Sequence, residues 1–385
     1  GDDAFVVILN GEDISDQLAL TGSAGDAART ATFDGLQPNT PYSGVIKVTD
    51  SLGLVTELQV SFDTFDEDDG FLVESEDYND GGGFFTDDPA PGDNYQFPGM
   101  ENVDFSDTTV DSTNDYRDDG SLLDYTDATD NSDVPRQKFV DAGGEGQFAD
   151  WQIDAIETDE WLNYTRTFPN EAFIPYLRAG AGTDRVMRLD LVTGDRTQED
   201  QTTAPLAAFY VAQTRTVNTY GYTPATDAFG ALRVVNLSGE TTVRLTAVDV
   251  DNDVNHNYVF FSATDLSETT DSWVFDVMPE PGETGVAADT AVEASIIAGA
   301  SSIDKASVKI MVDDVDVTAD STIADGDNGV DVSYASSASL SNGPHTVKLS
   351  YDDGSGGTKT DEWTFTVGEG GEAPTIAISE DPNQA

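Results

Sequence analysis

Aspartates at alternate positions are the first residues in this sequence that could do chemistry. The run Asp-Val-Asp-Asn-Asp places Asp249, Asp251 and Asp253 two residues apart. Side chains two residues apart in an extended chain point the same way, and carboxylate oxygens are ligands that calcium prefers. The run therefore predicts a calcium site. A solvated turn without a metal ion is an equally good interpretation of the same residues.

Further acidic clusters lie at 66–70, 127–133, 313–316 and 325–329. None of them has the pattern of an EF-hand loop, which needs a glutamate at its twelfth position. Crowded carboxylates repel one another unless a cation bridges them. We expect calcium to rigidify the joint at 63–69, where one of these clusters connects two domains.

Residues for acid–base or nucleophilic catalysis are scarce. The sequence has no cysteine and only two histidines, His256 and His345, so cysteine–histidine chemistry is excluded. It contains neither a Gly-x-Ser-x-Gly elbow nor a His-Glu-x-x-His zinc motif. Both histidines fall in strand-like segments, which favours structural roles. A glycosidase needs only two carboxylates, and the sequence alone does not single out such a pair. We expect a protein that is not an enzyme.

The charge of the chain restricts its partners. It has 74 Asp and Glu against 17 Lys and Arg, for a formal net charge of -57. Such a surface repels phosphate backbones and anionic lipid headgroups, which argues against nucleic acid and against membrane docking. No apolar run reaches the roughly 18 residues of a membrane span. Aspartate outnumbers glutamate, as expected for turns and cation-binding loops, although a saline habitat gives a similar composition.

Short strands dominate the secondary-structure pattern. With 38% hydrophobic and 9% aromatic residues, the chain can bury cores. Several segments alternate β-branched or aromatic residues with polar ones between Gly, Asp, Asn or Pro, which indicates half-buried strands. They are 42–49, 54–62, 160–168, 241–248, 257–261, 307–312, 345–351 and 362–367. Closely spaced strands with turn-rich joints predict an all-β protein built of sandwiches or jelly rolls.

Similar segments at the two ends of the chain predict related domains. A turn at 36–42 leads into a strand with an Asp/Gly turn at 45–53, and a closing strand follows at 56–65. The same order recurs at 340–346, 347–354 and 360–367. It resembles immunoglobulin-like and fibronectin type III-like domains of bacterial surface proteins. The resemblance implies a β-sandwich over 1–67 and another over 265–368.

The middle of the chain, 68–264, carries different motifs. They are Phe71-Leu-Val-Glu-Ser-Glu-Asp-Tyr78, Glu160-Trp-Leu-Asn-Tyr164, Leu237-Ser-Gly-Glu-Thr-Thr-Val-Arg-Leu245 and Asn255-His-Asn-Tyr-Val-Phe-Phe261. In their order these motifs resemble family 6 carbohydrate-binding modules. The resemblance implies a jelly-roll sandwich, usually with a structural calcium ion. The predicted fold is thus all-β, with three tandem β-sandwich domains: immunoglobulin-like, jelly roll and immunoglobulin-like.

The resemblance also implies a position for calcium. In that family the ion lies where the first and last strands meet, held by the opening acidic residues and by a residue of the closing strand. Glu74, Glu76 and Asn257 fall on those positions. Asn257 stands where aspartate is frequent, so it offers a carbonyl oxygen without a charge. The alternative is that these acidic side chains are only solvated.

Sugar recognition in that family uses two aromatic residues and an asparagine. Ala155 occupies the first aromatic position, six residues before Trp161, so one wall of the stacking slot is missing. Phe229 is aligned with the second aromatic residue and Asn255 with the asparagine. These departures and matches make a glycan site an open prediction.

Other aromatic side chains can replace the missing wall, because sugar stacking needs only an exposed ring with a polar neighbour. The candidates are Trp151, Tyr220 and Tyr222. For each of these rings, and for Phe229, a place in the core is the alternative.

The two terminal domains differ in extent. Segment 307–317 matches 4–14, but the last domain begins well before 307, whereas only three residues precede 4. We therefore expect the first domain to lack its opening one or two strands and to leave a sheet edge unpaired. After the last domain comes a tail, 369–385. Within it, Thr375, Ile376, Ala377, Ile378 and Ser379 read as an opening strand.

We expect 375–379 of one subunit to complete the first domain of the next by strand addition. A head-to-tail contact of this kind does not close on itself and builds a filament. The other interpretation is a fragment of a longer chain that was cut between tandem domains.

Together these features predict a non-catalytic, secreted or cell-surface protein that assembles head to tail into filaments and is stiffened by calcium. Its predicted partners are further copies of itself and polysaccharide. The alternative is a glycan-binding accessory region of a larger secreted hydrolase or adhesin.

Overall fold

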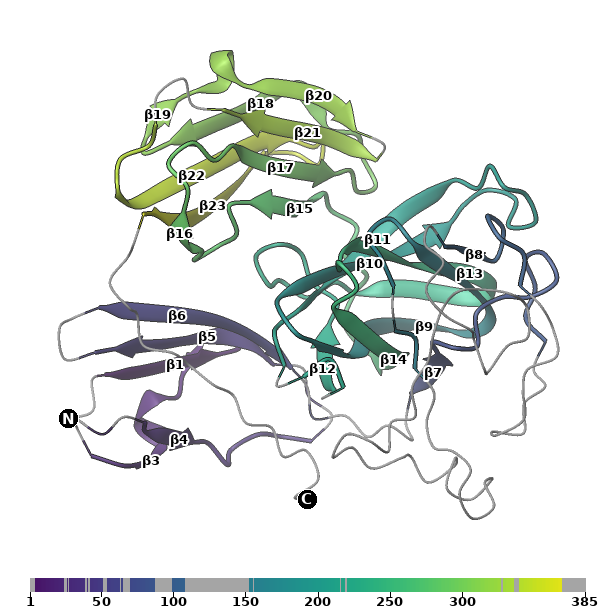
Figure 1. The fold of residues 1–385 in the computed structure, drawn as a ribbon, viewed down its shortest axis with the longest axis horizontal. Coiled ribbons are helices and arrows are strands. Elements are labelled where there is room, and N and C mark those ends of the chain that lie inside the picture. Colours follow the sequence, from purple (N-terminus) through teal and green to yellow (C-terminus); the bar gives the residue numbers. More distant parts are fainter. Residues whose placement is uncertain are drawn as a thin grey trace. The chain divides into compact units, whose positions relative to one another are not determined.

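The fold is taken from a computed structural model of the chain (Figure 1). It describes residues 4–23, 26, 28–38, 40, 42–50, 54–62, 64, 70–86, 99–107, 152–154, 156–214, 216–218, 220–326, 328–335 and 339–368. These residues form β-strands and short 3-10 turns, and no α-helix occurs among them. The predicted all-β sandwich fold is confirmed.

The N-terminal part is a four-stranded sheet with a small hairpin. The sheet has the order β2 (Glu12–Asp13), β1 (Phe5–Leu9), β5 (Tyr42–Thr49) and β6 (Val55–Phe62). The hairpin pairs β3 (Ala19–Thr21) with β4 (Thr30–Thr32), and the 3-10 turn η1 (Ser15–Gln17) precedes it. A small core of Val7, Leu9, Ile14, Tyr42 and Val60 lies within this part.

The middle part is an eight-stranded jelly roll. Its strands are β7 (Phe71–Glu74), β8 (Phe105–Ser106), β9 (Trp161–Ala181), β10 (Arg185–Val192), β11 (Thr203–Val211), β12 (Gly221–Pro224), β13 (Val235–Asp249) and β14 (Val254–Thr264). The sheet runs in the order β11-β10-β13-β9-β14-β7, and β8 and β12 also pair with β9.

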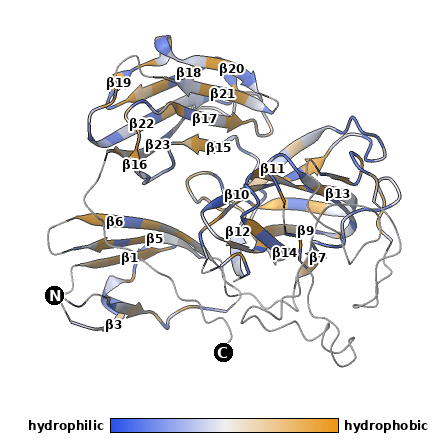
Figure 2. Cartoon of the chain, viewed as in Figure 1, coloured by the Kyte–Doolittle hydropathy of each residue, from blue (hydrophilic) through white to orange (hydrophobic). Residues whose placement is uncertain are grey.

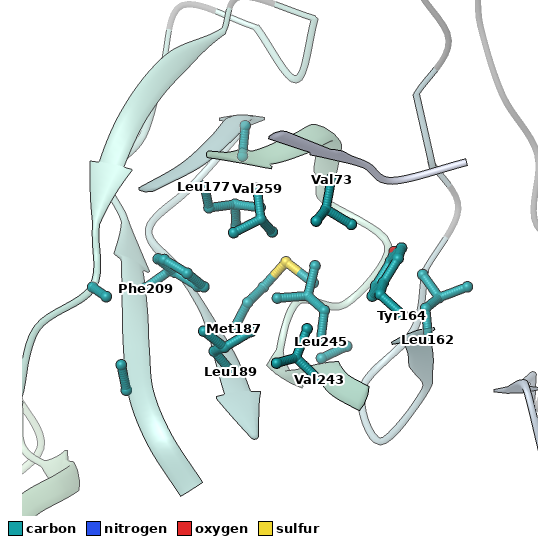
Figure 3. Close-up of a cluster of buried hydrophobic side chains, with 14 of the residues drawn as sticks. Val73, Leu162, Tyr164, Leu177, Met187, Leu189, Phe209, Val243, Leu245 and Val259 are labelled. Carbon is teal, nitrogen blue, oxygen red and sulfur yellow. The ribbon is translucent and has the colours of Figure 1, made fainter. Parts of the chain in front are cut away.

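The long strand β9 belongs to both layers of the jelly roll. Residues 161–173 of β9 pair with residues 235–246 of β13, and the start of β9 also pairs with β8. The second half of β9 pairs with β12 and β14. Exposed residues at 169–171 mark the bend between the halves. Figure 3 shows the core between the layers, with Val73, Leu177 and Val259 on one side and Met187 and Leu245 on the other.

The C-terminal part is a two-sheet sandwich. One sheet has the order β15 (Trp273–Met278), β17 (Val292–Ile297), β21 (Gly329–Tyr334) and β20 (Thr322–Gly326). The other has the order β16 (Thr284–Val286), β23 (Thr358–Val367), β22 (Gly343–Asp352), β18 (Asp304–Val312) and β19 (Val315–Asp316). Hydrophobic and hydrophilic residues share these strands (Figure 2), and the inward side chains form one core. This alternation buries one face of each sheet.

The N-terminal and C-terminal parts repeat one design in the same register. Ile310 pairs with Leu349 in the C-terminal part, and Val7 pairs with Ile46 in the N-terminal part. Each residue of the first pair has a number 303 higher than its equivalent in the second pair. A turn is also repeated: the backbone N–H of Val7 donates to Ser15 Oγ at 2.9 Å, and that of Ile310 donates to Thr318 Oγ1 at 3.1 Å. Among the described residues, the N-terminal part has no counterpart of β15, β16 or β17.

The contacts of the chain divide it into two compact units. One comprises Gly1–Phe65, Asp227–Ala231 and Thr270–Ala385, and the other comprises Asp66–Thr226 and Leu232–Thr269. The jelly-roll strands all belong to the second unit. A search of the described residues for a helix long and apolar enough to cross a membrane finds none.

The two repeats provide a matched test of core contributions. Leu349 is fully buried, so Leu349→Ala should lower the free energy of unfolding by about 2–5 kcal/mol. Ile46, its N-terminal equivalent, is only half-buried, so Ile46→Ala should cost less, about 1–2 kcal/mol. Differential scanning calorimetry of both variants in dilute solution checks the difference. Equal losses would contradict the difference in burial between these two equivalent residues.

Candidate functional site

A rigid glycine turn presents an aromatic ring to solvent on the jelly roll. Gly81, Gly82 and Gly83 all have positive φ, at 58°, 89° and 95°, a region that glycine adopts without steric cost. A Cβ atom at Gly83 would lie 2.6 Å from the carbonyl oxygen of Arg196. The next residue, Phe84, is 51% exposed. The constrained loop thus holds a large apolar ring outward.

The carboxylate of Asp104 holds this turn in place. It has no exposed surface and accepts hydrogen bonds from the backbone N–H groups of Gly82 at 2.9 Å, Gly83 at 2.5 Å and Met100 at 2.9 Å. Burial raises the pKa of Asp104, and the nearby charge of Asp80 adds to this effect, although the three N–H donors oppose it. Three donors on one buried acceptor group fix the loop backbone.

Phe84 forms one wall of a pocket of about 450 Å³. The other walls come from the end of β10, the connection to β11 and the middle of β13. The lining residues are Phe84, Leu191, Val192, Gly194, Asp195, Arg196, Thr197, Glu240, Thr241 and Thr242. The pocket thus combines one exposed ring with hydroxyl, carboxylate and guanidinium groups.

Arg196 connects the ring to the polar side of the pocket. Its Cζ lies 5.5 Å from the centre of the Phe84 ring. Its Nε donates to the carbonyl oxygen of Gly83 at 2.7 Å, and its Nη2 donates to Glu240 Oε1 at 2.7 Å. Both bonds orient the guanidinium, so the donors and acceptors of the pocket are in place before any ligand arrives.

A hydrogen-bonded polar network continues along the same face of β13, because residues 242, 244 and 246 alternate with the core positions. Arg244 stacks on Trp161 with its Cζ 3.5 Å from the ring centre. It donates to Asn163 Oδ1 at 2.9 Å and to Gln201 Oε1 at 2.6 Å. Burial lowers the pKa of Arg244 to about 10, while Asp190 opposes the shift. The group therefore stays charged at neutral pH.

The predicted calcium ligands Glu74, Glu76 and Asn257 lie where β7 meets β14, and all three are buried. The backbone N–H of Ser75 donates to the carbonyl oxygen of Asn257 at 2.9 Å. Arg178 Nη1 donates to Asn257 Oδ1 at 2.7 Å, so a guanidinium already uses that oxygen. Across the residues that the structure describes, no three His, Asp or Glu side chains are grouped so that they could hold a metal ion.

Asp249, Asp251 and Asp253 do not form an extended run, because Asp251 lies in a turn with φ of 48°. Arg185 instead bridges Asp249 at 3.4 Å and Asp253 at 3.2 Å. Hydrogen bonds from Thr183 and Arg185 lower the pKa of Asp253. A short polar run with Asp and Asn prefers a turn to a strand.

The two residues that the resemblance aligns with sugar binding, Asn255 and Phe229, belong to different compact units. Asn255 is buried, and its Nδ2 donates to Asn218 Oδ1 at 2.6 Å. Phe229 belongs to the other unit, where it packs on Trp363 with ring centres 5.9 Å apart. This contact matches the core alternative for Phe229. Trp151, Ala155, all of the joint at 63–69 except residue 64, and the assembly residues 375–379 lie outside the described residues.

Tyr220 and Tyr222 are half-buried beside Arg178, whose Cζ lies 4.5 Å from the Tyr220 ring. The hydroxyl of Tyr222 is hydrogen-bonded to that of Tyr258. Tyr258 itself has no exposed surface. These rings therefore form a cluster with the guanidinium of Arg178.

The two histidines occupy different environments. His256 has no exposed surface, and its Nδ1 is 2.7 Å from Ser75 Oγ. Burial lowers the pKa of His256 to about 3. His345 bonds to Asp313 at 2.6 Å and to the carbonyl oxygen of Ser341 at 2.7 Å. Burial lowers the pKa of His345, but these bonds and the charge of Asp313 outweigh it, so the net shift is upward.

The pocket at Phe84 and Arg196 was not predicted from the sequence. A usable signal was present: the run Gly-Gly-Gly-Phe-Phe at 81–85 joins a flexible turn directly to aromatic residues in a loop. The partners of Phe84 could not be found in this way, because Arg196 and Glu240 follow more than a hundred residues later.

No protein-family model and no curated protein sequence matches this chain. Among solved structures, a family 6 carbohydrate-binding module of Clostridium stercorarium in complex with cellobiose is 20% identical, with 31% of this chain and 78% of that chain covered and a TM-score of 0.24. Another family 6 module is 13% identical over 51% and 95%, with a TM-score of 0.30. The C-terminal module of a marine laminarinase from Zobellia galactanivorans is 16% identical over 29% and 79%, with a TM-score of 0.22. These values are too low to assign a family or a function.

The presence of only two histidines gives a direct test of their environments. In an NMR titration, the imidazole signal of His256 should not shift between pH 8 and pH 4.5, whereas that of His345 should titrate above its usual range. His345→Gln assigns the two signals. A His256 signal that titrates near its ordinary pKa would contradict its burial.

The same burial makes stability depend on pH. The imidazole of His256 is protonated near pH 6.5 in the unfolded chain, but only near pH 3 in the folded chain. Its contribution is therefore complete above pH 6.5 and is lost as the pH falls toward 3, by at most about 1.4 kcal/mol per pH unit. Urea unfolding of His256→Gln and of the parent chain at pH 7 and pH 4.5 measures this difference.

Proposed function

We propose that this chain is a non-catalytic, extracellular binding module whose jelly roll holds a polysaccharide in the pocket at Phe84. The observation that carries this proposal is the exposed, rigidly held ring of Phe84 beside the oriented guanidinium of Arg196. The resemblance of the strand motifs to family 6 carbohydrate-binding modules also supports it. The chain then acts as a glycan-binding accessory region of a larger secreted hydrolase or adhesin.

The chemistry of the pocket suits a neutral glycan. A sugar ring presents an apolar face that stacks on an aromatic ring and hydroxyl groups that both donate and accept hydrogen bonds. Phe84 offers the stacking face, Arg196 offers donors, and Asp195 and Glu240 offer acceptors. Two carboxylates and one guanidinium leave the pocket with a net negative charge, which disfavours acidic sugars.

Phe84→Ala should weaken glycan binding by about tenfold or more, because the loss of one aromatic contact is worth roughly 1–2 kcal/mol. The measurement is a screen of the parent chain on a glycan array, followed by calorimetric titration with the best oligosaccharide. Gly83→Ala should weaken binding as well, since a Cβ atom there collides with the backbone of Arg196.

Leu266→Ala is the matched control, because Leu266 is also exposed and belongs to the same unit, but does not line the pocket. The affinity of the Leu266→Ala variant for the oligosaccharide should equal that of the parent chain. An array without any bound glycan, or equal affinities for Phe84→Ala and Leu266→Ala, would rule out the pocket as the binding site.

Calcium stabilisation at the junction of β7 and β14 is a further part of the proposal. Glu74 and Glu76 are buried there, and two buried carboxylates in one short segment are costly unless they are compensated. When the free calcium concentration is a hundred times the dissociation constant, binding adds about 2.7 kcal/mol to the free energy of unfolding. The alternative is that Arg178 and other polar groups provide all the compensation.

Calcium should raise the melting temperature of the parent chain, and EDTA should reverse this rise. Glu76→Gln should abolish the rise in melting temperature with calcium. Glu240→Gln should retain this rise, because it changes an exposed carboxylate that is distant from Glu76 in the sequence. Scanning calorimetry in calcium, magnesium and EDTA measures these shifts. A melting temperature that EDTA leaves unchanged would remove the support for calcium.

Self-association is a second candidate function. The observation in its favour is the sequence of 375–379, which alternates two isoleucines with small or polar residues as a strand does. Strand donation from this segment to the first domain of another copy leads to head-to-tail filaments. Electron microscopy of the concentrated protein tests whether filaments form.

A further inference from the structure

The threonines of the pocket at Phe84 are already engaged within the protein. Three of them line the pocket, and each hydroxyl group is hydrogen-bonded to another protein group. The pairs are Thr197 with Asp195, Thr241 with Ser238 and Thr242 with Thr165, at 2.7, 3.1 and 2.7 Å. The charged side chains of the pocket therefore have the greater bonding capacity left for a ligand.

Arg196 retains most of its donors. A guanidinium has five N–H groups and no acceptor. One N–H of Arg196 donates to the carbonyl oxygen of Gly83 at 2.7 Å, and another donates to Glu240 Oε1 at 2.7 Å. The other three have no acceptor among the residues that the structure describes. Since the group is planar and rigid, the two bonds also fix the directions of these remaining donors.

Two carboxylates accompany this guanidinium in the pocket. Glu240 is bound to it through Oε1, and Asp195 uses Oδ1 for the backbone N–H of Thr197 at 3.0 Å and for its hydroxyl group at 2.7 Å. Hydrogen bonds from Thr197 lower the pKa of Asp195, and the charge of Arg196 adds to this effect. Within the described part of the chain, the second oxygen of each carboxylate is left as an acceptor.

We propose that this pocket selects sugar residues that carry two free hydroxyl groups on adjacent ring carbons. One hydroxyl group donates to Asp195 and the other donates to Glu240, while both accept from Arg196. The inference rests on the proposed glycan-binding function and adds the class of sugar residue that the pocket takes.

The chemistry of a hydroxyl group explains this selection. It donates one proton and also accepts, whereas a carboxylate only accepts and a guanidinium only donates. Two adjacent hydroxyl groups therefore satisfy all three charged groups at once, and hydrogen bonds to charged groups are the stronger ones. A single hydroxyl group leaves one carboxylate without a donor. The apolar face of the same sugar ring stacks on Phe84.

The position of the glycosidic linkage decides which polysaccharides qualify. An unsubstituted hexopyranose that is joined through O3 keeps free ring hydroxyl groups only on carbons 2 and 4. Residues inside a 1,3-linked chain thus lack an adjacent pair, and only the chain end provides one. A residue that is joined through O2, O4 or O6 keeps an adjacent pair. The pocket should therefore reject the interior of 1,3-linked chains.

The test uses the full chain with methyl glucopyranoside, methyl mannopyranoside and the 3-deoxy and 6-deoxy derivatives of both. Removal of the 3-hydroxyl group leaves no adjacent pair, whereas removal of the 6-hydroxyl group leaves the ring hydroxyl groups intact. In NMR titrations the 3-deoxy sugars should bind about tenfold more weakly than the parent sugars, or weaker still. The 6-deoxy sugars should bind within about threefold of the parent sugars.

Glu240→Gln should reduce the difference between the parent and 3-deoxy sugars, because it removes one of the two charged acceptors. Glu171→Gln is the matched control, since Glu171 is an exposed carboxylate of the same unit that does not line the pocket. It should retain the full difference. A difference that Glu240→Gln leaves unchanged would contradict the role of this carboxylate.

The failure of the inference is distinguishable from that of the proposed function. A chain that binds neither these sugars nor any glycan on the array would overturn both. Array binding that depends on Phe84, together with equal affinities for the parent and 3-deoxy sugars, would overturn only the selection of adjacent hydroxyl groups. Array binding without measurable binding of either parent sugar would also overturn it, because both sugars carry adjacent hydroxyl groups.

Discussion

The jelly roll depends on one strand that serves two layers. A sheet with one apolar face must bury that face against another layer, and here β9 supplies part of both. Its bend near Pro169 is exposed, and the residues on either side of the bend return to the core. β13 pairs with residues 161–173 of β9 and β14 with residues 172–181, and both Tyr164 and Leu177 are buried in the core. A break in β9 would therefore separate strands that are far apart in the sequence.

Alternation of polar and apolar residues predicted several of the half-buried strands, although β17 and β21, which also alternate, were missed. Segment 42–49 coincides with β5, and the predictions at 307–312, 345–351 and 362–367 fall within β18, β22 and β23. Strands that are nearly continuously buried were missed. The second half of β9 and much of β11 carry apolar or small residues on both faces, so they lack the period of two on which the prediction relied.

The candidate site was less accessible to sequence reasoning than the fold. The resemblance directed attention to Phe229 and Asn255, whereas the exposed ring belongs to Phe84. The loop that exposes this ring is held by hydrogen bonds from Gly82 and Gly83 to the carboxylate of Asp104 and from Arg196 to the carbonyl oxygen of Gly83. These are tertiary contacts. The run 249–253 failed for a local reason, because Asp251 takes a left-handed conformation that aspartate tolerates better than most residues. Composition alone does not separate a turn of this kind from an extended acidic run.

The separation of 301 to 303 residues between equivalent strands of the two repeats has a consequence during synthesis. Neighbouring domains of the same topology can exchange strands while they fold. At the usual rates of translation, equivalent strands of these repeats leave the ribosome about 15 to 60 s apart. The chain between them forms an unrelated fold around β9. Order of emergence and an intervening domain thus both keep two copies of one design from mispairing within a single nascent chain.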